Sequence, residues 1–169
     1  MSFTKNSLIL LIVFVNFAGI SQDIKWLSWE EATTANDKKP KKLFVDIYTD
    51  WCGWCKRMDQ GTFKDSSIIA YMNANFYAVK LNAEQKESIF WQDTEFKWME
   101  GGRNGFNTLA VELLDRQMSF PSFVILDGAY AKILVSPGYK EAPALLKQLK
   151  FAKEEAYRDG TWEEYQSKS

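Results

Sequence analysis

Residues 42–56 read KLFVDIYTDWCGWCK and carry the clearest structural signal in the chain. Its first eight residues are mostly aromatic, β-branched or aliphatic, which is typical of a buried strand. Cys52 and Cys55 follow in a C-x-x-C spacing, and the residues after them can continue as a helix to about Gln60. A strand that leads through a C-x-x-C pair into a helix is the context in which such a pair indicates redox chemistry.

The two cysteines are the only ones among 169 residues, and the chain has no histidine. Structural zinc needs four ligands, usually Cys or His, so a metal site is not expected. Haem attachment requires a histidine after the second cysteine, where Lys56 stands. A purely structural disulfide is the remaining alternative, although so short a loop constrains the unfolded chain little. The sequence therefore favours a redox couple that works without a bound cofactor.

The helix is expected to begin near Cys52. Helix N-termini carry unpaired N–H groups and partial positive charge, which stabilise a thiolate, the form that attacks disulfides. Cys55, three residues further on, can then resolve a mixed disulfide within the same molecule. Asp46 is the one acidic residue inside the apolar strand, where a charge is out of place.

The rest of the chain alternates between helical and extended patterns. Helices are expected over 28–39, 65–74, 107–118 and 142–158, and strands over 76–82, 122–126 and 131–136. SIFW (88–91) and EFKW (95–98) indicate a further hairpin, followed by a loop over 100–105. In this hairpin, alternation places Phe90 on the opposite face from Ile89 and Trp91. This order predicts a single α/β domain over residues 22–169, with a mixed sheet flanked by helices.

Residues 1–21 have the pattern of a secretory signal peptide. Lys5 precedes an apolar run over residues 8–18, and the small residues Gly19 and Ser21 precede a cleavage point before Gln22. The run is shorter than the roughly 20 residues that span a bilayer. A buried N-terminal helix is the alternative. We expect export to the periplasm or medium of a bacterium, without stable membrane insertion after cleavage. The net charge of −1 shows no basic excess that would indicate nucleic-acid binding.

The stretch FVDIYTDWCGWCK (44–56) resembles the active-site segment of thioredoxin-fold proteins. It matches in the Trp before the first cysteine, the Lys after the second and the Asp six residues before the first. SFPSFVILDG (119–128) resembles the cis-proline segment of that family. Residues 86–104 are extra relative to the minimal fold, as in exported bacterial relatives. Gly53-Trp54 departs from the Gly-Pro of thioredoxins and the Gly-His common in disulfide isomerases.

The resemblance implies a role for each matching residue. Cys52 would be the exposed nucleophile and Cys55 the buried resolving thiol. Asp46, its pKa raised by desolvation, would take the proton from Cys55. The cis-proline would lie against Cys52, and the backbone beside it would pair with a substrate strand. The residues expected to bind substrate are Trp51, Gly53, Trp54, Phe120 and Pro121, although core packing is the ordinary alternative for the two tryptophans.

These inferences predict an exported thiol–disulfide oxidoreductase that acts on protein disulfides. Trp54 cannot stabilise a thiolate by charge, as a histidine in that dipeptide would, so a reductase or isomerase fed by an electron-donating partner is favoured over an oxidase. The alternative is a peptide-binding or assembly module that keeps the fold with an inert disulfide.

Overall fold

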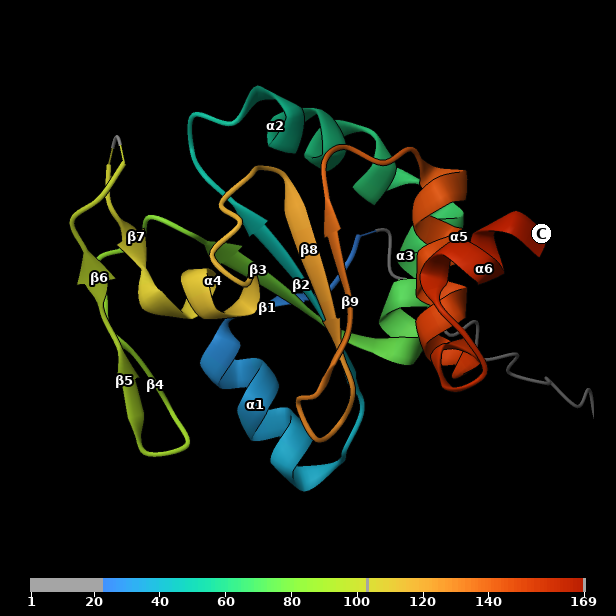
Figure 1. Cartoon of the computed structure of the whole chain (residues 1–169), viewed down its shortest axis with the longest axis horizontal. Helices are drawn as coiled ribbons and strands as arrows, with labels where there is room; N and C mark the ends of the chain where they lie inside the picture. Colours follow the sequence, from blue (N-terminus) through green and yellow to red (C-terminus); the bar gives the residue numbers. More distant parts are fainter. Residues whose placement is uncertain (1–22, 103, 169) are drawn as a thin grey trace, which may run out of the picture.

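The computed structural model describes residues 23–102 and 104–168, so the expected signal segment 1–21 lies outside the described residues. A five-stranded sheet forms the centre, in the order β1-β3-β2-β8-β9 (Figure 1). β1, β3 and β2 run parallel, β8 is antiparallel to β2, and β9 is antiparallel to β8. The strands are β1 (Trp26–Leu27), β2 (Lys42–Tyr48), β3 (Phe76–Asn82), β8 (Ser122–Leu126) and β9 (Lys132–Pro137).

Helices cover both faces of the sheet, which confirms the expected architecture (Figure 1). α1 (Trp29–Lys38) and α4 (Thr108–Leu113) bury one face, and the other lies under α2 (Gly53–Gln60), α3 (Ser66–Asn75) and α5 (Ala142–Lys153). A 3₁₀ turn, Thr62–Lys64, joins α2 to α3. Val45 and Ile47 pack toward α1 and α4, whereas Phe44 packs toward the other helices. Because side chains alternate along a strand, Asp46 also faces the side of α2.

The insertion and the residues just after it form two short ladders beside α4 (Figure 1). β4 (Ile89–Trp91) and β5 (Thr94–Phe96) make the expected hairpin, and the left-handed backbone of Gln92 and Asp93 closes its two-residue turn. β6 (Trp98–Met99) pairs with β7 (Phe106–Asn107), a ladder that the sequence did not predict. The predicted alternation is confirmed, since Ile89 is buried and Phe90 is 66% exposed.

Two predicted helices are shorter than expected, and a further short helix follows the second of them. α4 ends at Leu113, followed by the left-handed residues Asp115 and Arg116; α5 ends at Lys153, shortly before the left-handed Glu155. Such backbone cannot continue a right-handed helix. After the 3₁₀ turn Ala156–Arg158, the tail forms α6 (Trp162–Lys168). Within the described ranges, no helix has the length and apolarity needed to cross a membrane.

Candidate active site

The cysteine pair lies where β2 passes into α2. Cys52 is the N-cap of α2 and is disulfide-bonded to Cys55. The Cys55 backbone N–H donates to Cys52 Sγ at 3.1 Å, so the sulfur sits over the first turn of the helix. A thiolate at Cys52 would lie near this helix N-terminus, where N–H groups and the helix dipole stabilise negative charge.

The exposed surface beside the disulfide belongs to tryptophans rather than to sulfur. Cys52 is only 4% exposed and Cys55 only 2%, so the expectation of an exposed Cys52 is wrong for the oxidised form. The reason is that the Cys52 side chain is turned back over α2 by its bond to Cys55. Trp51 and Trp54 are 51% and 55% exposed, so neither is a core residue. Gly53 is exposed, and a Cβ atom there would meet no neighbour within 4 Å.

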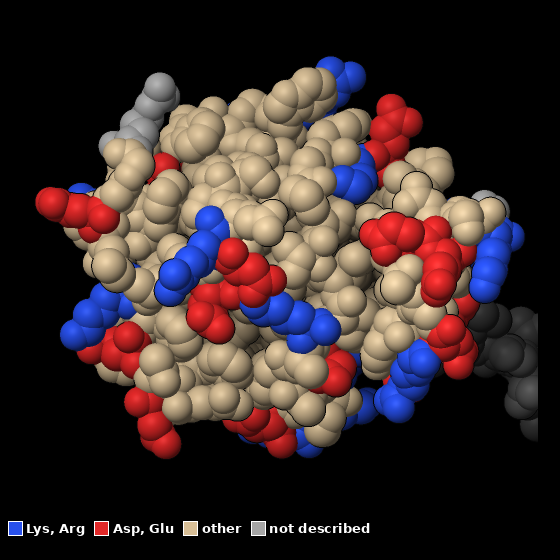
Figure 2. Space-filling model, viewed as in Figure 1, with Lys and Arg blue, Asp and Glu red and all other residues tan. Residues whose placement is uncertain are grey.

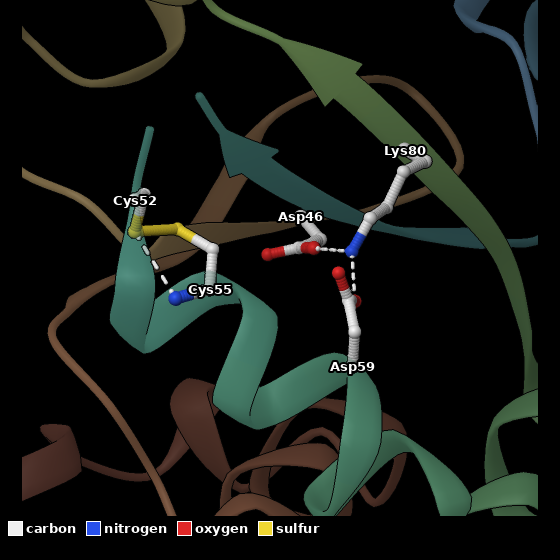
Figure 3. A network of polar contacts seen from close by, with 5 residues as sticks. All are labelled: Asp46, Cys52, Cys55, Asp59 and Lys80. Atoms are coloured by element: carbon white, nitrogen blue, oxygen red, sulfur yellow. Dashed lines mark hydrogen bonds and ion pairs between the residues drawn. A yellow bond between two sulfur atoms is a disulfide. The ribbon is translucent and has the colours of Figure 1, made fainter. Parts of the chain in front are cut away.

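Asp46 lies beneath the pair in a three-residue ionic network (Figure 3). Its Oδ2 accepts from Lys80 Nζ at 2.5 Å, and Lys80 also pairs with Asp59 of α2. The Asp46 side chain is 1% exposed, against 21% for Lys80 and 42% for Asp59. Asp46 and Lys80 are register partners on the neighbouring parallel strands β2 and β3. Lys80 therefore connects a fully buried carboxylate to one at the surface.

Burial controls the acidity of Asp46. It raises the pKa of this carboxyl from 3.8 to about 6, although Lys80 acts in the opposite direction. This confirms the direction and the cause expected from the apolar strand. Burial by itself would lower the pKa of Lys80, but Asp46 and Asp59 outweigh it and raise that pKa. The Lys80 ammonium also lies over three rings, those of Trp26, Tyr48 and Phe63, at 5.0–5.1 Å from their centroids.

The second oxygen of Asp46 has a distinct position. In Figure 3 it points toward the Cys52–Cys55 disulfide, away from Lys80. Among the residues that the structure describes, this buried Oδ1 has no hydrogen-bond partner. An unpartnered buried carboxylate oxygen costs stability and calls for an explanation. A cavity of about 410 Å³ opens on the other side of the network, lined in part by Lys80 and Asp59.

The cis-proline segment meets the cysteine pair at the same end of the sheet. The Phe120–Pro121 peptide bond is cis, as the resemblance implies. Ser122 pairs with Ile47, which places Pro121 beside the carboxyl end of β2. Phe120 packs edge-on against Trp51, with ring centroids 6.0 Å apart. On the face shown in Figure 2, charges of both signs are interspersed, and the upper edge, where Figure 1 places the start of α2, is largely uncharged.

Three residues of this site were not identified from the sequence: Lys80, Asp59 and Glu84. Lys80 and Asp59 complete the network around Asp46, and Glu84 accepts a hydrogen bond from Trp51 Nε1 at 2.7 Å. A signal for Asp59 does exist, because it lies four residues after Cys55 and so shares its helix face. As for metals, residues 23–102 and 104–168 contain no cluster of three or more Cys, Asp or Glu side chains placed to hold an ion.

Comparisons with known proteins agree with this geometry. Residues 16–123 match the family model Thioredox_DsbH, described as a protein of unknown function, DUF255. Spermatogenesis-associated protein 20 of Rattus norvegicus is 27% identical over 67 residues, which are 39% of this chain but only 8% of that protein. An uncharacterized protein of Archaeoglobus fulgidus is 27% identical over 63 residues, 37% of this chain and 50% of its own length. The chain thus spans at most half the length of these relatives.

Solved structures show the same fold over most of the chain. "DsbH Oxidoreductase" superposes with a TM-score of 0.56 at 15% identity, covering 89% of this chain and 95% of its own. A thioredoxin-fold protein from Helicobacter pylori superposes with a TM-score of 0.58 at 18% identity, covering 90% of this chain and 89% of its own. A candidate disulphide-isomerase from Bacteroides thetaiotaomicron superposes with a TM-score of 0.52 at 27% identity, covering 76% of this chain and 89% of its own. The chain has the thioredoxin fold and, by the match to more than half its residues, belongs to the Thioredox_DsbH family.

Proposed function

We propose that this protein is a thiol–disulfide oxidoreductase that acts on protein disulfides through Cys52 and Cys55. The observation that carries the proposal is the unpartnered Oδ1 of Asp46, buried and pointing toward the disulfide. An inert staple has no use for a buried acid whose pKa lies near neutrality, whereas a proton acceptor does. The thioredoxin fold and the position of Cys52 at the N-terminus of α2 add support.

In the reducing direction, the Cys52 thiolate attacks a client disulfide, one client sulfur leaves as a thiolate, and a mixed disulfide forms. The Cys55 thiol then passes its proton to Asp46, and its sulfur attacks Cys52 Sγ. This step releases the second client thiolate and leaves the Cys52–Cys55 disulfide. Two electrons have moved to the client, and a dithiol partner returns them in a second exchange.

Lys80 and Asp59 give the proton on Asp46 a path to solvent. Lys80 Nζ contacts both carboxylates, and only Asp59 is substantially exposed. The cavity that Lys80 and Asp59 line is large enough to hold water next to the network. Lys80 also stabilises the ionised form of Asp46, so the carboxylate is available to accept a proton near pH 7.

The direction that we favour is reduction or isomerisation. Trp54 stands between the cysteines and packs 5.3 Å from Tyr139, with Arg57 over its ring. An indole cannot stabilise the Cys52 thiolate by charge, so the reduced form lacks the stabilisation that makes a strong oxidant. Trp51, Gly53, Trp54, Phe120 and Pro121 form the surface on which we expect a client strand to bind.

We further propose that the protein acts after export, on the pattern of residues 1–21. Its clients then fold in an oxidising compartment, where disulfides form and persist. Expression in a bacterium and N-terminal sequencing of the exported protein test this. A mature chain that begins at Gln22 is the expected result.

Insulin reduction by dithiothreitol tests the activity itself. The wild type should accelerate the reaction, and Cys52→Ser should leave only the uncatalysed rate. A Lys56→Gln variant, which alters the exposed residue next to Cys55, serves as a matched control and should retain turnover. A wild type no faster than Cys52→Ser would favour the alternative, a peptide-binding or assembly module with an inert disulfide.

A further inference from the structure

A second cavity, of about 380 Å³, lies beside Trp51, the residue that precedes Cys52. It opens between the residue before Cys52 and the residue before Pro121. Its walls come from four separate segments of the chain and comprise Trp51, Glu84, Phe106, Met118, Ser119 and Phe120. Its volume is at the lower end of the range for small-ligand sites, a size that suits one side chain rather than a whole peptide.

The insertion (residues 86–104) and the strand β7 that directly follows it shape this cavity. Phe106, in β7, packs against Phe120 with ring centroids 6.2 Å apart. Asn104, in the loop before β7, donates its side-chain N–H to both oxygens of Glu84, at 3.1 and 3.2 Å. Glu84 in turn accepts from Trp51 Nε1. The loop that is extra in this chain therefore holds the exposed indole next to Cys52.

The chemistry of the walls selects the occupant. Both oxygens of Glu84 already accept hydrogen bonds from neutral donors of the protein, Asn104 and Trp51. What the cavity offers to a ligand is the ring surface of Trp51, Phe106 and Phe120, together with the Met118 side chain. Aromatic rings and thioethers favour apolar and aromatic partners.

We propose that this cavity, Trp51–Glu84–Phe106–Met118–Ser119–Phe120, binds a large apolar side chain of the client, leucine or phenylalanine in size, next to the client cysteine. The insertion thereby sets substrate preference without taking part in sulfur exchange. This proposal rests on the function proposed above, since it names the clients of the same site.

Binding to the oxidised protein tests the cavity independently of turnover. Seven-residue peptides carry serine in place of the client cysteine, with Phe, Leu, Ala or Lys at the positions flanking it. NMR shift titration should give a Kd for the Phe and Leu peptides about tenfold lower than for the Ala peptide. Ser119→Trp should fill the cavity and abolish this difference while leaving the Ala peptide unaffected. Gln117→Trp places the same indole outside the cavity and should preserve the difference.

The same peptides with cysteine, as disulfide-linked dimers, supply the kinetic arm. The Phe and Leu dimers should have a lower KM than the Ala dimer, with nearly the same kcat for all three. Equal Kd values for Phe and Ala peptides, or a preference for the Lys peptide, would overturn the apolar pocket; the latter result would show that Glu84 binds a cation. Apolar preference in binding without turnover of any dimer would instead refute the oxidoreductase and leave the pocket intact.

Discussion

The cysteine end of β2 and the insertion depart from the usual distribution of residues in opposite ways: the first buries charge, and the second exposes apolar side chains. At the cysteine end, the buried Asp46 carboxylate, 1% exposed, pairs with Lys80, which is 21% exposed and lies among aromatic rings. In the insertion, large apolar groups face solvent, with Phe90 66% and Met99 60% exposed. Buried charge lowers stability, and exposed apolar area favours association. On the function proposed above, the buried charge would serve proton transfer, and the uncovered apolar surface of the insertion would serve partner contact.

The largest expected effect comes from the cysteines. Cys52→Ser should abolish turnover, because no nucleophile remains, whereas Cys55→Ser should accumulate mixed disulfides that cannot be resolved. In the reduced wild type, Cys52 should also be alkylated faster than Cys55 near neutral pH, with a pKa below the free value of about 8.5. Mass spectrometry measures the mixed disulfides of Cys55→Ser and the order in which the two wild-type cysteines are alkylated. Equal alkylation of the two cysteines and no trapped client would indicate a purely structural disulfide.

Asp46→Asn should slow turnover by about 100-fold, a typical loss for a general base, while making the protein more stable. The native pKa of about 6 exceeds the ordinary 3.8, so the native state binds more protons than the unfolded state. Its stability therefore falls as pH rises from about 4 to 6 and stays lower above that range. The shift corresponds to roughly 3 kcal/mol at pH 7.

Denaturant unfolding at several pH values checks this sign. In the Asp46→Asn variant the fall between about pH 4 and 6 should be lost, with Lys80 still paired to Asp59. A destabilised variant with unchanged kinetics would show that Asp46 has only a structural role.

A smaller effect is expected from Asp59→Asn. Asp59 shares Lys80 with Asp46, and its charge contributes to the raised pKa of Asp46. Without it, Lys80 pairs with Asp46 alone, and the pKa of Asp46 should fall. The pH midpoint of turnover should therefore move to lower pH. Asp93→Asn, in the hairpin turn, is the matched control and should leave the midpoint in place. An unmoved midpoint in Asp59→Asn would remove Asp59 from the network's function.

The smallest effects on chemistry are expected in the hairpin. There, substitutions at the buried Ile89 and the exposed Phe90 distinguish a role in stability from a role in partner binding. Ile89 is 1% exposed and belongs to the core, so Ile89→Ala should cost about 2–5 kcal/mol of stability. Phe90→Ser should change stability by less than about 0.5 kcal/mol. If the exposed face contacts a partner, Phe90→Ser should reduce turnover with the protein partner and spare a small-molecule disulfide. If Phe90→Ser keeps the wild-type rate with both substrates, the hairpin only stabilises the fold.

The sequence predicted what is encoded locally. The strand, the C-x-x-C pair and the helix follow one another within 19 residues, so their arrangement needs no knowledge of distant contacts. The ionic network depends instead on the register between β2 and β3. A clue is visible, since KLFVDIY and FYAVKLN both carry a charge at their fifth position, and parallel pairing aligns these two residues. Which strands pair, however, is a tertiary property.

The link from Asn104 through Glu84 to Trp51 has no comparable local signal. Its three members come from different loops that only the folded chain brings together. The same holds for the exposure of Cys52, which depends on how its side chain is turned over α2. Periodicity predicts which residues share a face of an element, but it carries no information on contacts between loops.

The reduction potential of the Cys52–Cys55 pair distinguishes a redox couple from a structural disulfide. Equilibration with dithiothreitol or glutathione buffers, followed by alkylation and mass spectrometry, gives the fraction of protein oxidised at each ratio. A redox-active pair should titrate as a two-electron couple between about −120 and −270 mV, and a reductase should lie toward the lower end of that range. A potential below about −300 mV, typical of structural disulfides in secreted proteins, would show that the pair is not a redox couple.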